Sequence, residues 1–164
     1  MKRHLPLFAA ALALLIPALL PAAANVVRPA PDFVLATGKP VRSLRGQPVV
    51  LLVAPSPRSR AFRKQVRRLE ADYQRYAARS TVFVAAFTQS AEGLESNIPF
   101  VIARDGASVA AQYGVNTPFG LAVIGRDGNL DLITSEVSGG YRVRDAILNN
   151  YELQTQERRP PAQR

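Results

Sequence analysis

The chain has no cysteine and only one histidine among its 164 residues. Without cysteine it can form no disulfide, and no thiolate is available for disulfide exchange or peroxide reduction. The one histidine is His4. The rest of the chain can therefore form neither a Ser–His nor a Cys–His nucleophile pair, nor a conventional zinc or copper site. We expect no catalytic residue, no metal site and no cofactor, and we lean against an enzyme.

The first 24 residues have the order of a secretory signal peptide. Basic Lys2 and Arg3 precede an apolar run over residues 5–20, and three alanines follow at 22–24. This order predicts cleavage near Ala24 and a periplasmic or secreted mature protein. The apolar run, about 16 residues, is short for the roughly 20 that span a bilayer. We therefore expect no transmembrane span in the mature form, and a retained N-terminal anchor is the alternative.

Residues 25–153 are predicted to form one α/β domain. Continuous apolar, β-rich runs at 49–53 and 81–87 are typical of strands buried on both faces. Between these runs, apolar residues at helical spacing predict one helix from an N-cap at Ser59 to about Arg79. Its apolar face consists of Phe62, Val66, Leu69, Tyr73 and Tyr76.

The remaining pattern completes a mixed sheet. The other predicted elements are an extended lead-in over 30–46 with a short strand pair around Gly38, a strand at 100–103, a helix at 107–113, a hairpin of strands at 121–124 and 130–134, and a helix at 143–153. A strand–helix–strand unit requires a parallel pair with a right-handed crossover, and the hairpin adds antiparallel neighbours. We therefore expect an α/β fold with helices on both faces of the sheet. Residues 154–164 are too polar to pack and are expected to form a disordered tail.

Charge is concentrated on the predicted long helix. The chain has a net charge of +9, and eight basic residues but only two acidic ones lie from Arg58 to Arg79. Such a surface would attract anionic lipid head groups or an acidic protein, or it is a solvated face that keeps the protein soluble. Export and the lack of interleaved aromatic residues argue against nucleic acid as a partner. The basic face comprises Arg60, Arg63, Lys64, Arg67 and Arg68.

Several short motifs resemble the redoxins, the thioredoxin-like group that includes the peroxiredoxins (AhpC/TSA-like proteins). The matching stretches are Ala30-Pro31-Asp32-Phe33, the strand from Pro48 to Leu52, Ile98-Pro99-Phe100, Tyr113-Gly114-Val115, Thr117-Pro118 and Arg126-Asp127-Gly128. Together they cover about residues 30–150. The resemblance implies a thioredoxin-like fold, with a central mixed β-sheet flanked by helices on both faces.

The reactive loop departs from the redoxin pattern. Peroxiredoxins carry a proline, a Thr or Ser four residues on, and the peroxidatic cysteine three further. Here Pro55 and Ser59 fit that pattern and Phe62 stands at the sulfur position; in a rival register, Ser56 and Ser59 replace the cysteines of Cys-x-x-Cys. Serine cannot take over the chemistry, because an alkoxide is far less accessible than a thiolate. The degenerate reactive loop comprises Pro55, Ser56, Ser59, Arg60 and Phe62.

Thr117-Pro118 resembles the cis-proline segment beside the reactive loop of thioredoxin folds, where the residue before the proline can hydrogen-bond an extended peptide. An ordinary trans proline at the end of a loop is the alternative, and both stay open. A second resemblance, to a family of small exported bacterial domains of unknown function, implies no activity. The stretches that carry this second resemblance are Ala54-Pro55-Ser56-Pro57, Phe62-Arg63-Lys64-Gln65 and residues 119–128.

Two functional hypotheses from different classes follow. The favoured one is an exported, redox-inactive binding module, a chaperone-like or adaptor domain of the cell envelope. It would hold an unknown protein or peptide in a groove lined by Ser56, Ser59, Arg60 and Thr117. The alternative is a redoxin-class oxidoreductase or antioxidant protein that uses the thiols of a partner. A weaker alternative is binding to an anionic envelope surface through the basic face.

Overall fold

The computed structural model describes residues 28–157 of the chain. The predicted signal peptide and residues 158–164 of the predicted tail lie outside the described residues. The elements follow in the order η1 (Val41–Leu44), β1 (Val49–Ala54), α1 (Arg60–Glu70), α2 (Tyr73–Ala77), β2 (Val82–Phe87), β3 (Phe100–Ile102), α3 (Gly106–Gln112), β4 (Gly120–Ile124), β5 (Leu130–Thr134) and α4 (Gly140–Glu157).

The five strands form one mixed sheet in the order β3-β2-β1-β4-β5. β1 and β2 are parallel, with Val50 opposite Phe83, and α1 and α2 form the crossover between them. β4 lies antiparallel on the other side of β1, and β5 lies antiparallel beside β4. The predicted mixed sheet, with a parallel strand–helix–strand unit and an added hairpin, is confirmed.

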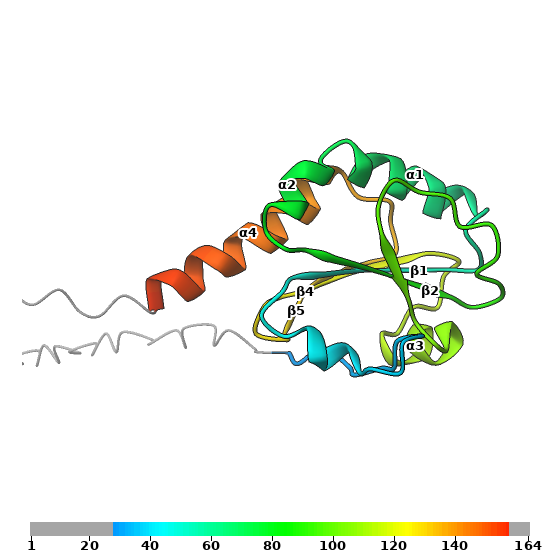
Figure 1. Ribbon diagram of the computed structural model, residues 1–164, viewed down its shortest axis with the longest axis horizontal. Helices are drawn as coiled ribbons and strands as arrows, with labels where there is room; N and C mark the ends of the chain where they lie inside the picture. The colour runs from blue at the N-terminus through cyan, green and yellow to red at the C-terminus, as the bar shows by residue number, and fades with distance from the viewer. Residues whose placement is uncertain (1–27, 158–164) are drawn as a thin grey trace, which may run out of the picture.

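Each face of the sheet buries its own cluster of side chains, because successive residues of a strand point to opposite faces. Val50 and Leu52 of β1 belong to the cluster beneath α1, α2 and α4. Leu51 and Val53 belong to the cluster on the opposite face, beneath α3 and the lead-in. Figure 1 shows this arrangement, with α1, α2 and α4 on one side of the sheet and α3 on the other. A strand buried on both faces requires the continuous apolar sequence seen in β1.

The long helix predicted to run to about Arg79 is broken into α1 and α2. At Asp72 the backbone leaves helical geometry, with φ −113° and ψ 12°, and α2 starts at the next residue. Only residues 71 and 72 separate the two helices. Tyr73 and Tyr76 therefore still face the same side of the sheet as Phe62 and Leu69 of α1. Tyr76 of α2 packs edge-on against Phe83 and donates a 3.0 Å hydrogen bond to the carbonyl oxygen of Gly140.

The last helix is longer than predicted at both ends. α4 begins at Gly140 rather than at residue 143, and it continues through Glu157 rather than ending at 153. The first residues of the predicted tail, 154–157, are therefore helical. The strand pair predicted around Gly38 is present as a bridge between Val34 and Pro40, with Gly38 in the left-handed region at φ 85°.

Candidate functional site

The degenerate reactive loop begins at Pro55, directly after the last residue of β1. In the antiparallel pairing of β1 with β4, Val53 lies opposite Gly120, the first residue of β4. The Thr117–Pro118 segment, which leads into β4, therefore lies at the same end of the sheet as the reactive loop. The structure thus brings together, at one end of the sheet, the two segments that the redoxin resemblance singles out.

Phe62, at the predicted sulfur position, is buried in an aromatic cluster. Its side chain is 2% exposed. Its ring centroid lies 5.1 Å from that of Phe87, edge-on, and 5.7 Å from that of Phe100. Aromatic pairs at such distances add about 0.5–1.5 kcal/mol to the stability gained from burial alone. Phe62 is therefore a core residue in the first turn of α1, as its place on the apolar face predicts.

The two serines of the loop do not form a reactive pair. Ser59 is at the N-cap position of α1, yet its side chain makes no capping bond, and its Oγ is buried without a hydrogen-bond partner. Ser56 accepts a 3.1 Å hydrogen bond from the backbone nitrogen of Ser59 through its carbonyl oxygen, which closes a turn. With no histidine after His4, no imidazole base is available to activate either hydroxyl.

The Thr117–Pro118 bond is trans, since residues 28–157 contain no cis peptide bond. Both residues are exposed. The hydroxyl of Thr117 donates a 2.8 Å hydrogen bond to the carbonyl oxygen of Phe119, so the segment bonds to itself. Thr117 lines a shallow hollow with Tyr113 and Glu136, which does not include the predicted groove partners Ser56, Ser59 and Arg60.

Four of the five residues of the basic face are exposed, and the fifth turns inward. Arg68 is half-buried, and its guanidinium donates a 2.9 Å hydrogen bond to the carbonyl oxygen of Val137. Arg68 is therefore a structural contact between α1 and the segment before α4. The exposed cations, together with Arg58 from the loop, form an open basic face of Arg58, Arg60, Arg63, Lys64 and Arg67. Within the described part of the chain, none of these five forms an ion pair.

A groove of about 340 Å³ runs along α1 below this face. Phe62 and Val66 form its apolar floor, and Arg58, Arg63 and Arg67 line its rim. We call it the α1 groove. It starts beside the reactive loop, at Pro57 and Arg58, and it shares no lining residue with the hollow at Thr117.

Two carboxylates also line the α1 groove. Glu70 is already engaged, because its Oε1 accepts hydrogen bonds from the Ser96 hydroxyl at 3.2 Å and from the Asn97 nitrogen at 3.0 Å. Glu95 lines the groove as well. Three arginines against two carboxylates leave the groove with a net positive charge, which Arg60 and Lys64 on the same helix increase.

Gln65 is a residue that the sequence analysis missed. It is fully buried although polar, and its amide oxygen accepts a hydrogen bond from the backbone nitrogen of Ser138. A signal was present, because position 65 lies three residues after Phe62 and one before Val66, on the inward stripe of the helix. A polar residue at such a position predicts a buried hydrogen bond.

The described residues offer no group of three His, Cys, Asp or Glu side chains that could hold a metal ion. Over the same residues, no helix combines the length and the apolar composition that crossing a bilayer requires.

No family model matches the sequence, and no curated protein matches it. Solved structures do match the fold. A candidate thiol:disulfide interchange protein, DsbE, from Chlorobium tepidum superposes with a TM-score of 0.58 at 20% identity, over 80% of this chain and 94% of that one. Peroxidoxin BcpB from Mycobacterium tuberculosis gives 0.58 at 21% identity, over 77% and 96%. The mitochondrial 2-Cys peroxiredoxin from Plasmodium falciparum gives 0.61 at 15% identity, over 83% and 99%.

These similarities define the fold of the protein. The chain has the thioredoxin-like fold of the redoxins, and it has no cysteine. The thioredoxin-like fold that the redoxin resemblance implies is therefore confirmed over most of the chain. At such low identities the similarity establishes the fold alone, and the thiol chemistry named for those proteins belongs to them.

Proposed function

We propose that this domain is a redox-inactive binding module that holds an acidic segment of a protein partner in the α1 groove, as an adaptor in the cell envelope. The signal-peptide pattern of residues 1–24 supports the compartment. The absence of cysteine, with a buried phenylalanine at the sulfur position, supports a role without thiol chemistry.

One observation carries the proposal: the open basic face has no acidic partner within the described residues and borders a groove with an apolar floor. The two carboxylates of the groove are outnumbered by the cations around it, and cations in excess repel one another and slightly destabilise the fold. An acidic segment would relieve that repulsion at Arg63 and Arg67, while its apolar side chains contact the small part of Phe62 and Val66 that lines the groove. Charges near the surface contribute modestly one by one, so several must act together.

Fluorescence anisotropy with a labelled decapeptide of alternating Glu and Leu tests the proposal, with a Gln/Leu decapeptide as the neutral probe. The double variant Arg63→Gln/Arg67→Gln should weaken binding of the Glu/Leu peptide about 5- to 10-fold. The matched control, Lys39→Gln/Arg104→Gln, removes two exposed cations outside the groove and should change it by less than about 2-fold. Raising the salt concentration should weaken binding to the wild type.

Equal binding of the two peptides, or equal affinity of the groove variant and the control, would reject an acidic partner in the α1 groove. Binding to vesicles of anionic lipid but not to the peptide would instead support the envelope-surface alternative. Reduction of insulin disulfides or of peroxide clearly above a buffer blank would overturn the redox-inactive role and favour the oxidoreductase alternative.

A further inference from the structure

A second cavity lies at the opposite end of the sheet from the reactive loop. It is enclosed by the lead-in, η1, the start of β1 and the turn between β4 and β5, and its volume is about 190 Å³. The six-residue length of β1 separates this end of the sheet from the reactive loop by about 20 Å. We call this cavity the η1 pocket. It is independent of the α1 groove and of the function proposed for it.

The floor of the η1 pocket is apolar. Val41, Val49 and Ile124 are buried, and Leu44 is half-buried beside them. The volume is below the roughly 300–1,000 Å³ of pockets for drug-sized ligands, so the pocket suits a small molecule. An apolar floor with a few polar groups at its mouth is the usual composition of a small-molecule site.

The polar groups at the mouth leave one positive charge uncompensated. Asp32 is paired with Arg42, because its carboxylate accepts a 3.1 Å hydrogen bond from the backbone nitrogen of Arg42 and lies 3.3 Å from the Arg42 Nε. Arg45 also lines the pocket. Its side chain makes no ion pair and no hydrogen bond to any residue that the structure describes.

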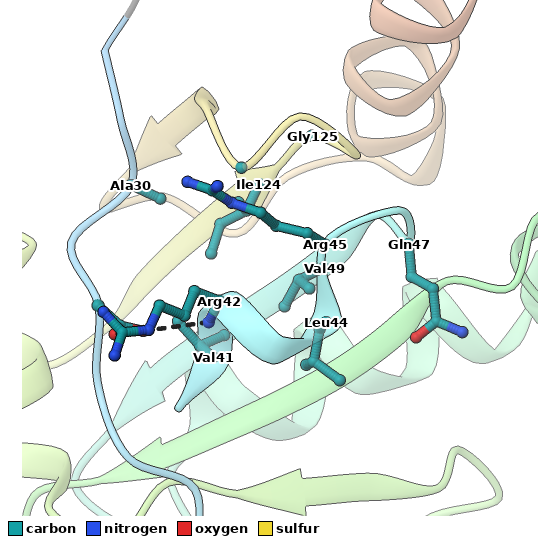
Figure 2. Close-up of a pocket in the computed structure, with 11 residues that line it drawn as sticks. Ala30, Val41, Arg42, Leu44, Arg45, Gln47, Val49, Ile124 and Gly125 are labelled. Carbon is teal, nitrogen blue, oxygen red and sulfur yellow. Dashed lines mark hydrogen bonds and ion pairs between the residues drawn. The ribbon is translucent and has the colours of Figure 1, made fainter. Parts of the chain in front are cut away.

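The side chain of Arg45 lies against the turn between β4 and β5. A Cβ on Gly128, which has φ 85°, would lie 3.0 Å from the Arg45 Nε, so the side chain packs directly on the glycine backbone. Figure 2 shows Arg45 reaching over the pocket toward Ala30, while Arg42 lies on the other rim. The walls are tied together, because the Ala30 nitrogen donates a 3.0 Å hydrogen bond to the Gly128 carbonyl oxygen.

We propose that the η1 pocket binds a small organic carboxylate. The apolar body of the ligand packs against Val49 and Ile124, and its carboxylate accepts hydrogen bonds from the guanidinium of Arg45. A guanidinium offers two parallel donors that match the two oxygens of a carboxylate. The carboxylate of the ligand thereby balances the charge of Arg45, as Asp32 balances the charge of Arg42 on the opposite rim.

Titration of the ¹⁵N-labelled protein with hexanoate, hexanamide and hexylamine, followed by amide chemical shifts, tests this proposal. Hexanoate should shift the amides of Leu44, Gly125 and Gly128 and bind at least about 5-fold more tightly than hexanamide, because only the carboxylate forms a charge-assisted bond. The variant Arg45→Gln should remove that difference and leave hexanamide binding unchanged. Arg142→Gln, which removes an exposed cation on α4, should leave both affinities unchanged.

A second variant tests the position of the ligand. Ala30→Phe places a ring at the mouth and should abolish binding of hexanoate and hexanamide alike. If that variant does not fold, the affinity ratio in Arg45→Gln still decides the question. The proposal is overturned if hexanamide or hexylamine binds as tightly as hexanoate, if Arg45→Gln keeps the wild-type preference, or if the shifts lie on α1 instead.

Discussion

The amide oxygen of Gln65 accepts a 2.8 Å hydrogen bond from the backbone nitrogen of Ser138, 73 residues further along the chain. The bond is buried and joins α1 to the segment that leads into α4. Arg68, three residues after Gln65, makes a second bond to the same segment through Val137. The helix that follows the reactive loop is therefore held, through its own side chains, to the segment that leads into the last helix of the domain.

Replacing Gln65 tests this connection. Gln65→Ala should cost about 1–3 kcal/mol for the unpaired Ser138 amide, and lost packing adds to that cost, while removal of the buried Gln65 Nε2, which has no partner, offsets part of it. Gln65→Leu restores most of the volume but not the acceptor, so it should be more stable than Gln65→Ala. In both variants hydrogen exchange at the Ser138 amide should be faster than in the wild type. Gln74→Ala, at an exposed position of α2, is the control, and unchanged exchange at Ser138 would contradict the connection.

Phe62 should be one of the most sensitive positions of the domain. Phe62→Ala removes a ring that contacts Phe87 and Phe100, and we expect it to lower the free energy of unfolding by about 3–5 kcal/mol. Urea denaturation measures this loss. Tyr141→Ala, at a residue that is 66% exposed, should change stability by less than about 0.5 kcal/mol. A loss at Phe62 no larger than this control would show that the ring is not part of the core.

A cysteine introduced at position 62 should be unreactive in the folded protein. Burial in apolar surroundings disfavours the thiolate, and the thiolate is the reactive form. The thiol of Phe62→Cys should react with an aromatic disulfide reagent slowly in native buffer and rapidly in urea. Arg60→Cys, at an exposed position, should react rapidly in both. Equal rates for the two variants in native buffer would contradict the burial of position 62.

Ser59→Ala should be neutral or stabilising by up to about 1 kcal/mol. The Ser59 hydroxyl is buried without a partner and makes no capping bond, so its removal relieves an unsatisfied group. Asp105 provides the contrast, because its carboxylate accepts a 2.9 Å hydrogen bond from the Ser108 nitrogen and caps α3. Asp105→Ala should therefore cost about 0.5–2 kcal/mol. Thermal or urea unfolding of both variants checks the prediction, and a clear loss in Ser59→Ala would contradict it.

Stability should fall between pH 10 and pH 12. Burial, assisted by the negative charge of Asp72, raises the pKa of Tyr76 from 10.0 to about 12. Between pH 10 and pH 12 the folded protein keeps the hydroxyl proton of Tyr76, whereas the unfolded chain loses it. The contribution of Tyr76 to the free energy of unfolding is therefore complete below pH 10 and is lost as the pH rises to about 12. The loss is at most about 3 kcal/mol. Burial raises the pKa of Tyr113 as well, and Asp32 adds to that rise, so both tyrosines act in the same direction.

Urea denaturation at pH values from 9 to 12 measures this loss. Tyr76→Phe should reduce the dependence on pH, and it should cost about 1 kcal/mol at neutral pH because the hydrogen bond to Gly140 is lost. The exposed Tyr141→Phe should retain the full dependence. A wild-type slope in Tyr76→Phe would contradict the assignment to Tyr76.

Local patterns in the sequence were enough to predict the strands and most helix positions. The apolar run of β1 predicts a strand buried on both faces, and the spacing from Phe62 to Leu69 predicts the inward stripe of α1, because burial acts on each side chain where it stands. The same spacing did not reveal the break at Asp72. Tyr73 and Tyr76 continue the apolar period, so the break is visible only in the backbone of Asp72, which leaves helical geometry at φ −113° and ψ 12°.

The absence of cysteine, and with it the exclusion of thiol chemistry, was decided by the sequence alone, since composition does not depend on folding. So was the apolar character of position 62. Only the tertiary structure decided that Arg68 bonds to Val137, that the Ser59 hydroxyl has no partner, and that Arg45 lies over a cavity between η1 and the β4–β5 turn. Each of these depends on groups far apart in the chain, and a single sequence contains no local signal for the partner that folding brings to a polar side chain.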